Sequence, residues 1–350
     1  MPPQPIRVGI VGAGANTRLR HIPGFRGIDG VEIVAVANRT PESTERVARE
    51  FDIPRTFDTW QSLVTDDDID AVLVGTWPNL HCEVTCAALD AGKHVLTEAR
   101  MARDLAEAQQ MLAASEKHSD LVTQVVPSPF GLECGPAVRR LLDDNFIGEL
   151  RELVVIGVDD MFRDYSQPLH WRQDAAISGK NVLSLGILHE TALRWTPPPV
   201  RVMAQTATFE PTRPKLDESR YVDVTVPDSV HVMTQLENGG RGLYHMNGVL
   251  LFGPGRQIHM YGSRGTIKVE FGDSETIRVG HSSDTDLRQI EIPDDLRGSW
   301  RVEEEFVAAI RGEDTVRLND FATALRYMEF TEAVAESAES GAAVTLPQPD

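Results

Sequence analysis

Cysteine is scarce in this chain, and long hydrophobic runs are absent. Its 350 residues include three cysteines, Cys82, Cys86 and Cys134. An odd and sparse set argues against a disulfide framework and favours a reducing, cytoplasmic environment. No run approaches the ~18 apolar residues of a membrane span. The start, Met1–Pro5, lacks the basic and apolar regions of a secretory signal. We therefore expect a globular cytoplasmic protein.

Basic residues are also few relative to acidic ones. The chain has 34 Lys and Arg against 53 Asp and Glu, which gives a formal net charge of -19. A surface this acidic repels phosphate backbones and anionic lipids, so neither nucleic acid nor membrane is expected as a partner. A small-molecule substrate remains possible, because a few local basic residues can still build a site.

One cluster of possible metal ligands occurs in the sequence. His81, Cys82 and Cys86 lie close together, but His81 and Cys82 are adjacent and point apart on a helix. Small buried side chains are the better interpretation. We expect no metal site.

The first third of the chain alternates between strand and helix signals. A length of 350 residues predicts about two domains. In residues 1–126 apolar strands alternate repeatedly with helices, which is typical of a parallel sheet covered on both faces. We predict a Rossmann-type domain here, with strands at 7–12, 31–37, 70–75, 94–97 and 121–126 and helices at about 17–27, from 41, 80–91 and 105–116.

The pattern changes near Pro127. A helix is predicted over about 136–144 and a strand over 150–158. Between 200 and 292, short alternating runs are separated by turn signals such as Asn238-Gly239-Gly240, which is typical of antiparallel strands. Two helices, at about 300–311 and 320–339, end the chain. Residues 127–350 therefore predict an α+β domain with a large, mostly antiparallel open sheet.

A glycine-rich turn follows the first predicted strand. Gly12 and Gly14 fit the G-x-G-x-x-G pattern, whereas Thr17 stands at the third glycine. Small residues let the backbone turn tightly and let a pyrophosphate approach the free N–H groups of the next helix. The position of the turn predicts a dinucleotide site, and the alternative is a plain tight turn without cofactor. The predicted loop residues are Gly12, Ala13, Gly14, Ala15, Asn16 and Thr17.

The end of the second predicted strand bears on the choice of cofactor. An acidic residue usually stands there and binds the adenosine ribose. Here Asn38 removes the charge that would repel a 2′-phosphate, and Arg39 can pair with one. The sequence therefore slightly favours NADP over NAD. The alternatives are an Asn38 bond to a 2′-hydroxyl and a solvated Arg39.

Several motifs together resemble one known family, the Gfo/Idh/MocA oxidoreductases, relatives of glucose-fructose oxidoreductase and inositol dehydrogenase. The resemblance implies a Rossmann domain, an α+β domain whose sheet commonly forms oligomer contacts, and hydride transfer between a nicotinamide and a secondary alcohol carbon of a sugar or polyol. A homodimer or homotetramer is expected. The motifs are Gly12–Gly14 with His21-Ile22-Pro23, Thr76–His81, Ala91–Glu98, His170–Gln173, Ser184–Gly186 with Arg194-Trp195, and Met260–Gly265.

Two departures from the family pattern concern catalysis. In family members the glutamate at the position of Glu98 is usually followed by a Lys that assists proton transfer. Here Ala99 follows Glu98, and Arg100 comes next. A guanidinium is a poor base, so Arg100 is expected to bind an anionic or polar substrate. In this family a helix of the second domain often carries Asp-x-Gly-x-His. Counting back without a gap from Arg194-Trp195 places Ser184 at the Asp position and Leu188 at the His position.

Several other side chains have the chemistry and the position for a role in the site. His189 is the best remaining base because histidine titrates near neutral pH, and the alternative is a histidine satisfied on a helix flank. Trp171 and Arg172 line the substrate pocket in the resemblance. The proposed catalytic set is His189, Glu190, Lys180 and Glu98. The loops after the predicted strands at 70–75 and 94–97 add further cofactor contacts, namely Thr76, Trp77, Pro78, Asn79, His81 and Glu98.

Three functions remain open from the sequence. The first is an NAD(P)-dependent oxidoreductase acting on a sugar-like or polyol substrate. The second is an enzyme on the same cofactor fold with non-redox net chemistry, such as a lyase or epimerase. The third is a dinucleotide-binding regulatory protein without turnover. The missing Lys at Ala99 motivates the second.

Overall fold

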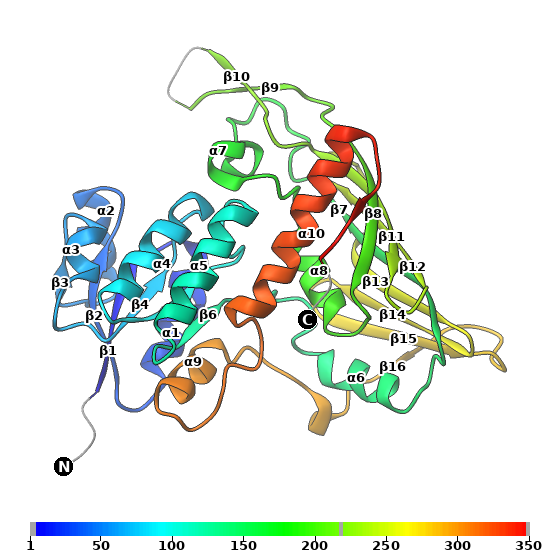
Figure 1. Ribbon diagram of the computed structural model, residues 1–350, viewed down its shortest axis with the longest axis horizontal. Coiled ribbons are helices and arrows are strands. Elements are labelled where there is room, and N and C mark those ends of the chain that lie inside the picture. The colour runs from blue at the N-terminus through cyan, green and yellow to red at the C-terminus, as the bar shows by residue number, and fades with distance from the viewer. Residues whose placement is uncertain (1–4, 217–219, 348–350) are drawn as a thin grey trace. The chain divides into compact units, whose positions relative to one another are not determined.

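The computed structural model describes residues 5–216 and 220–347, and the chain folds into two compact units (Figure 1). The first unit comprises Met1–Pro127 together with Arg301–Leu325. The second comprises Ser128–Trp300 together with Arg326–Asp350. The predicted boundary lies between residues 126 and 127, and the structure adds the returning segment 301–325 to the first unit.

A six-stranded parallel sheet forms the centre of the first unit. Its strand order is β3-β2-β1-β4-β5-β6, so the order reverses between β1 and β4. At such a switch point the loops of a doubly wound sheet diverge and leave room for a ligand. The strands are β1 (Ile6–Val11), β2 (Val31–Ala37), β3 (Arg55–Thr56), β4 (Ala71–Val74), β5 (His94–Thr97) and β6 (Thr123–Val125).

Helices of the first unit begin where the local chemistry favours a cap. Thr40, Thr59 and Asp104 each accept a hydrogen bond from a backbone N–H of the first turn, which satisfies donors that a helix start leaves free. The predicted helix over 17–27 divides into a π-helical turn, Thr17–His21, and α1. The helices are α1 (Ile22–Arg26), α2 (Pro41–Glu50), α3 (Trp60–Val64), α4 (His81–Asp90), α5 (Leu105–Lys117) and α9 (Val302–Ile310).

A nine-stranded sheet dominates the second unit. Its order is β16-β15-β14-β13-β7-β12-β11-β8-β17, and every pairing is antiparallel except that of β12 with β7. A separate pair, β9 (Thr212–Pro214) and β10 (Tyr221–Asp223), lies outside it. The nine strands are β7 (Leu150–Val158), β8 (Pro199–Ala207), β11 (Ser229–Leu236), β12 (Arg241–Asn247), β13 (Gly255–Gly262), β14 (Gly265–Phe271), β15 (Glu275–His281), β16 (Arg288–Ile290) and β17 (Val344–Thr345).

Alternation along the strands gives this sheet one buried and one exposed face. In β11 the residues Val230, Val232 and Thr234 are buried, and those between them are exposed. The buried face packs into one apolar core with α6, α8 and the C-terminal part of α10. The helices are α6 (Gly135–Asp143), α7 (Ala175–Ser178), α8 (Leu185–Leu193) and α10 (Phe321–Ser340).

The fold class predicted from the sequence is confirmed. A parallel Rossmann sheet precedes a large, mostly antiparallel sheet. Within the described part of the chain, no helix combines the length and apolarity that a bilayer crossing requires.

Candidate functional site

The loop after β1 makes the tight turn that the glycine pattern predicts. Gly12 has a φ of 84°, and a Cβ on it would lie 2.9 Å from the backbone nitrogen of Thr76. Glycine is therefore required both by the backbone angle and by the close approach of the loop after β4. Arg18 N donates to Gly14 O at 3.1 Å, which begins the helical bonding. Gly12 N already donates to Ala37 O at 2.8 Å, so an anion at this helix start would be bound by N–H groups that follow Ala13.

Asn38, at the end of β2, ties this loop to the start of α2. Its Oδ1 accepts from Ala13 N at 2.7 Å and its Nδ2 donates to Ser43 O at 3.1 Å. Its backbone N–H donates to Thr44 Oγ1 at 2.9 Å. The side chain thus organises the loop, and no carboxylate occupies this strand end.

Arg39 and Trp77 form an exposed pair beside the same edge of the sheet. The Arg39 guanidinium carbon lies 5.7 Å from the centre of the Trp77 ring, which is 42% exposed. A cation over an aromatic face at this distance is attracted to it. The next two residues, Pro78 and Asn79, begin a 3₁₀ turn, and the buried Asn79 Oδ1 has no partner among the described residues.

His81, by contrast, is occupied within the protein. It is fully buried, with Nδ1 2.8 Å from Arg100 O and Nε2 3.1 Å from Thr76 O. Burial outweighs these backbone contacts and lowers its pKa below the ordinary range. The ring joins the loop after β4 to the loop after β5. Its neighbour Cys82 lies with its Sγ 4.0 Å from Cys86 Sγ, and no third ligand joins them within the residues described.

Glu98, directly after β5, is the centre of a polar cluster. Its Oε1 accepts from Asn16 Nδ2 at 2.7 Å and lies 3.0 Å from His21 Nε2. The other ring nitrogen of His21, Nδ1, contacts Glu303 of α9. The loop after β1, the following π-helical turn, the end of β5 and the returning segment therefore meet around one carboxylate.

The charges in this cluster stabilise one another. Burial disfavours the charged form of His21, but its bonds to Glu303 and Glu98 outweigh burial and raise its pKa to about 9. Burial likewise favours neutral Glu98, but the bond and the charge of His21, with the bond from Asn16, hold its pKa below the ordinary range. At neutral pH the cluster holds an imidazolium between two carboxylates.

Two members of this cluster were not among the predicted site residues. In the sequence, His21 belongs to the His21-Ile22-Pro23 motif, to which no role was assigned. Glu303 begins the acidic run Glu303–Glu305, which resembles a solvated helix start. A buried position for Glu303, which is 2% exposed, follows only from the return of α9 to the first unit. The sequence signal that could have indicated this cluster is the position of His21 close to the glycine loop.

In the second unit, His189 lies inside the apolar core. It is 1% exposed, its ring stacks on Phe330 with centroids 3.6 Å apart, and its Nδ1 lies 2.8 Å from the Tyr244 hydroxyl. Burial lowers its pKa to about 3. The ring is therefore neutral at physiological pH and is held on the helix by packing. This is the placement that the alternative interpretation of His189 describes.

The other two proton-carrier candidates of the second unit differ from each other. Glu190 is 5% exposed, accepts from Arg194 Nη2 at 2.6 Å and accepts from Ser128 N at 2.5 Å. Lys180 follows α7; its side chain is 44% exposed, and its Nζ lies 2.9 Å from Glu332 Oε1. Of these candidates, Lys180 is the one that solvent reaches freely.

Trp171 and Arg172 lie together in a short 3₁₀ turn, Trp171–Gln173. The Arg172 guanidinium carbon is 4.2 Å from the Trp171 ring centre. Burial, and then the charge of Arg256, lower the pKa of Arg172. Arg256 itself donates to Asp159 Oδ2 at 2.8 Å, whereas no carboxylate of the described residues pairs with Arg172. Arg100, the remaining substrate candidate, is buried in the first unit.

Both units match sequence models of one known protein family. The sequence model of the oxidoreductase family with an NAD-binding Rossmann fold, GFO_IDH_MocA, matches residues 6–125. The model of the GFO/IDH/MocA C-terminal domain matches residues 136–268. The chain belongs to this family. It is an NAD(P)-dependent oxidoreductase, as the sequence predicted.

Curated relatives of this family member catalyse several reactions. It is 27% identical to levoglucosan dehydrogenase of Pseudarthrobacter phenanthrenivorans over 277 residues, 72% of this chain and 68% of that protein. It is 32% identical to a dTDP-3,4-didehydro-2,6-dideoxy-alpha-D-glucose 3-reductase of Saccharopolyspora spinosa over 44% of this chain and 46% of the relative. It is 37% identical to 1,5-anhydro-D-fructose reductase of Ensifer adhaerens over 32% of this chain and 33% of that relative.

Solved structures share the fold of both units. Levoglucosan dehydrogenase in its apo form superposes with a TM-score of 0.89 at 22% identity, covering 99% of this chain and 100% of the other. The complex of that enzyme with NADH and L-sorbose gives a TM-score of 0.88 at 22% identity, covering 98% and 99%.

Apolar or small side chains occupy the positions at which the resemblance implies Lys, Asp and His, namely Ala99, Ser184 and Leu188. Leu188 is fully buried in the core of the second unit. The Ser184 hydroxyl lies 3.8 Å from Met246 Sδ. Ala99 has no group that can carry a proton.

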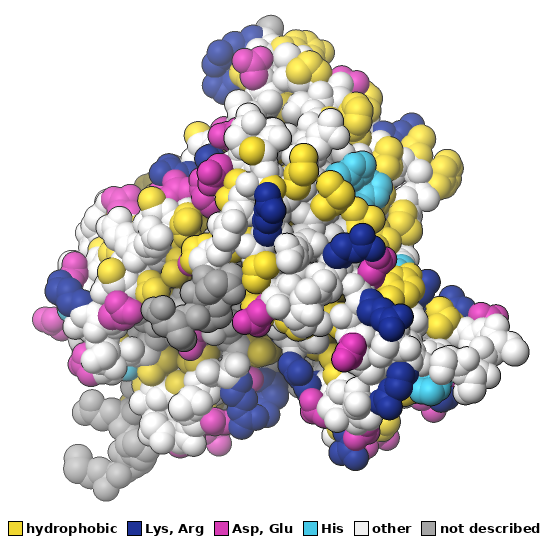
Figure 2. Space-filling model, turned by 45° about the vertical axis from the view of Figure 1, so that its right-hand side comes forward, with side chains coloured by type: hydrophobic (Ala, Val, Ile, Leu, Met, Phe, Trp, Pro, Cys, Tyr) yellow, Lys and Arg dark blue, Asp and Glu magenta, His cyan; other side chains and the backbone are white. Residues whose placement is uncertain are grey.

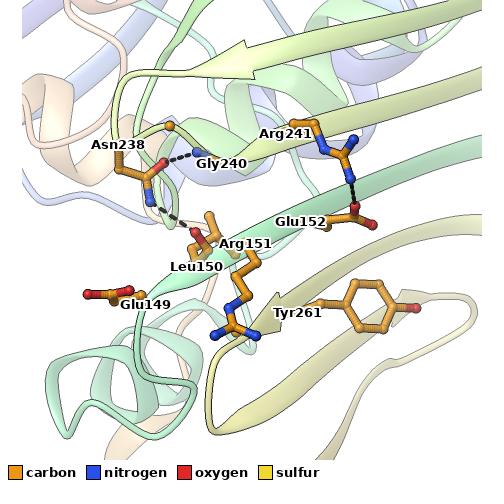
Figure 3. Close-up of a pocket in the computed structure, with 10 residues that line it drawn as sticks. Glu149, Leu150, Arg151, Glu152, Asn238, Gly240, Arg241 and Tyr261 are labelled. Atoms are coloured by element: carbon orange, nitrogen blue, oxygen red, sulfur yellow. Dashed lines mark hydrogen bonds and ion pairs between the residues drawn. The ribbon is translucent and has the colours of Figure 1, made fainter.

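A pocket of about 820 Å³ in the second unit contains none of the predicted site residues (Figure 3). The turn between β11 and β12 contributes Asn238, whose side chain bonds Gly240 N and Leu150 O, both at 3.1 Å. Arg241 pairs with Glu152 at 2.5 Å across two neighbouring strands. Asn238, Arg241 and Glu152 are thus bonded within the pocket lining, and we assign this pocket no role in the reaction.

Proposed function

We propose that this oxidoreductase transfers a hydride between NADP or NAD and a secondary alcohol or carbonyl carbon of a sugar, polyol or related small molecule. The observation that carries the proposal is the carboxyl edge of the parallel sheet. There the Gly12 turn, the Arg39–Trp77 pair and the Glu98 cluster belong to loops that follow adjacent strands. Ligands of doubly wound sheets bind at this edge.

The residues at this edge fit a dinucleotide. Glycine at position 12 lets the loop after β1 pack closely against Thr76, and the helix start that follows offers backbone N–H groups to a pyrophosphate. The buried Asn79 Oδ1 lacks a partner among the described residues and can accept a bond from a cofactor N–H or O–H. When bound, the nicotinamide supplies the hydride acceptor or donor.

Each predicted cofactor residue receives a specific task in this proposal. Residues 12–17 hold the pyrophosphate, and Asn38 fixes their loop through Ala13 N. Thr76 to Asn79 contact the cofactor, with Trp77 beside Arg39, and Glu98 lies near the nicotinamide ribose or amide. His81 acts through its neighbours, because both of its ring nitrogens already face carbonyl oxygens.

The cofactor is proposed to be NADP in preference to NAD. Asn38 brings no negative charge to the ribose, and the exposed Arg39 guanidinium can pair with a 2′-phosphate while it remains over Trp77. Replacing Arg39→Ala should weaken NADPH binding by about tenfold or more and leave NADH binding nearly unchanged. The control is Arg49→Ala, which removes an exposed cation from α2 that donates to Glu45 O. Equal losses for both cofactors would contradict the preference.

Substrate binding is proposed for Arg100, Trp171 and Arg172. A half-buried guanidinium stacked on an indole and without a carboxylate among the described residues is suited to a polar or anionic group of a ligand. The names of the curated relatives, which include sugar reductases and a levoglucosan dehydrogenase, support a sugar-like substrate class. Of the proposed proton carriers, the exposed Lys180 has the best access to solvent, whereas His189 and Glu190 are committed to buried partners.

The function is tested by binding and turnover together. Fluorescence titration with NADPH and NADH should show binding, and absorbance of the reduced nicotinamide should change with one member of a panel of sugars and polyols. A protein that binds neither cofactor contradicts the proposal. Product formed without an absorbance change indicates non-redox chemistry, and binding without any turnover indicates a regulatory protein.

A homodimer or homotetramer through the large sheet is also proposed. The exposed face carries a cross-strand row of Met203, Met233 and Leu243, each 45–58% exposed, paired in register across β8, β11 and β12. Hydrophobic and histidine side chains lie side by side on the face shown in Figure 2. Light scattering should give a dimer or tetramer, and Met233→Lys should dissociate it. A cytoplasmic location is part of the same proposal, since the sparse cysteines are free thiols in the described chain.

A further inference from the structure

His21 is a buried histidine held by two carboxylates from distant parts of the first unit. It is 0% exposed; its Nε2 lies 3.0 Å from Glu98 Oε1, and its Nδ1 contacts Glu303. Asn16 Nδ2 lies 3.3 Å from His21 Nε2 and also donates to Glu98. Every polar atom of the imidazole thus faces a partner.

The local backbone is shaped to admit Glu303. Gly24 lies one turn beyond His21, and a Cβ on it would lie 2.6 Å from Glu303 Oε2. A Cβ at this position would force the Glu303 side chain to shift, so glycine leaves the space that the carboxylate occupies. Phe25 meets Phe306 edge-on with centroids 6.4 Å apart, which fixes α9 against α1.

The charged groups that bond His21 within the described residues come from separate elements. Glu98 follows β5, Glu303 belongs to α9, and the neutral amide of Asn16 comes from the loop after β1. His81, on α4, is a further titratable neighbour of Glu98, and burial lowers its pKa, which disfavours its charged form. With His21 protonated, the two carboxylates and one imidazolium sum to one negative charge.

We propose that His21 and Glu303 are positioning residues that hold the Glu98 carboxylate ionised and oriented at the cofactor edge. Glu303 keeps the proton on His21, and protonated His21 fixes Glu98. The proton also sets the charge next to the nicotinamide. This inference rests on the proposed placement of Glu98 beside the nicotinamide half of the dinucleotide.

The proposal predicts different pH responses for the two redox forms of the cofactor. Loss of the His21 proton adds one negative charge near the ring and removes a donor from Glu98. The oxidised nicotinamide ring is cationic and the reduced ring is neutral, so the added charge favours the oxidised form. The ratio of the dissociation constants of NADPH and NADP⁺ should therefore rise when His21 loses its proton.

The experiment measures both dissociation constants by fluorescence between pH 6 and pH 10. The wild type should keep a constant ratio until His21 titrates at a pKa of about 9, and the ratio should then rise on the order of tenfold. In Glu303→Gln the rise should move down by about 1 to 3 pH units, because one opposite charge is lost. The control is Glu304→Gln on the same helix, an exposed carboxylate paired with Arg301, which should follow the wild type.

A second pair of variants changes the position of the Glu303 carboxylate without removing it. Gly24→Ala should displace Glu303 and shift the pH response in the direction of Glu303→Gln. Gly27→Ala, where a Cβ would meet its nearest neighbour at 3.4 Å, is the matched control and should not shift the response. If the site variants fail to fold, the imidazole NMR signal of wild-type His21 decides, and it should titrate near pH 9.

The outcomes separate this inference from the proposed function. A wild type that binds neither cofactor contradicts the function itself. Normal binding with a pH-independent ratio overturns the inference, as does an identical rise in wild type and Glu303→Gln. Titration of His21 near its ordinary pKa of 6.5 also overturns it.

Discussion

His21 in the first unit and His189 in the second are equally buried, yet their pKa values move in opposite directions. They are 0% and 1% exposed. Around His21, burial is outweighed by bonds to Glu303 and Glu98, and the pKa rises to about 9. Around His189, burial acts without any carboxylate, and the pKa falls to about 3. Burial alone therefore does not decide whether a histidine carries a proton.

The difference teaches which unit has charge available for chemistry. The first unit keeps an imidazolium and two carboxylates at the edge of its parallel sheet, where a cofactor is expected. The second unit uses its histidine as a flat, neutral ring that stacks on Phe330 and bonds Tyr244. Four predictions test this contrast.

The largest effect is expected from His21→Leu. The change leaves Glu98 and Glu303 buried without the cation between them, and breaking such a buried pair costs about 3–5 kcal/mol. The free energy of unfolding in urea at pH 7 measures the loss. Adding Glu303→Leu to this variant should recover part of it, because one unpaired charge is removed. A loss below about 1 kcal/mol would contradict the ion cluster, since exposed pairs contribute that little.

A smaller effect is expected from His189→Leu. The leucine keeps an apolar contact with Phe330 but leaves the buried Tyr244 hydroxyl without its bond, which costs about 1–3 kcal/mol. Urea unfolding again measures it. The double variant with Tyr244→Phe should lose less than the sum of the single changes, because both remove one hydrogen bond. A strictly additive result would argue against that bond.

The two histidines should also give the stability opposite pH dependences. The pKa of folded His21, about 9, exceeds its ordinary value of 6.5, so its contribution is full below pH 6.5 and is lost as the pH rises through 9. The pKa of folded His189, about 3, lies below 6.5, so its contribution is full above pH 6.5 and is lost as the pH falls toward 3.

Each slope is at most about 1.4 kcal/mol per pH unit for one proton. Unfolding free energies of wild type, His21→Leu and His189→Leu across pH 4 to 10 measure them. The alkaline slope should diminish in His21→Leu alone and the acid slope in His189→Leu alone. The same slope change in both variants would refute the contrast.

The smallest effect is expected from Lys180→Ala. The ion pair with Glu332 is partly exposed, with 44% and 29% of the two side chains accessible, and such pairs contribute about 0–1 kcal/mol. Thermal unfolding in low and high salt measures it, since salt screens an exposed pair. A loss of unfolding free energy as large as that of His21→Leu would show that exposure does not distinguish the Lys180–Glu332 pair from the buried His21 cluster.

Local sequence signals predicted much of the secondary structure. The strands over 31–37, 94–97 and 150–158 have the predicted bounds, because apolar runs between turn signals define buried strands. Thr40 caps α2 as its position before Pro41 indicates. The π-helical turn before α1 was not predicted, because the residues from Thr17 to Gly27 satisfy one continuous helix pattern equally well.

The amino-acid sequence by itself determined the two-domain plan, the family and the glycine turn at Gly12, because these depend on short segments whose chemistry is local. Tertiary structure alone decided which candidates carry charge. The return of residues 301–325 to the first unit brings Glu303 to His21, and the packing of α8 on α10 places His189 against Phe330. Burial and partners from distant segments set the pKa of an ionisable group, and no local pattern encodes them.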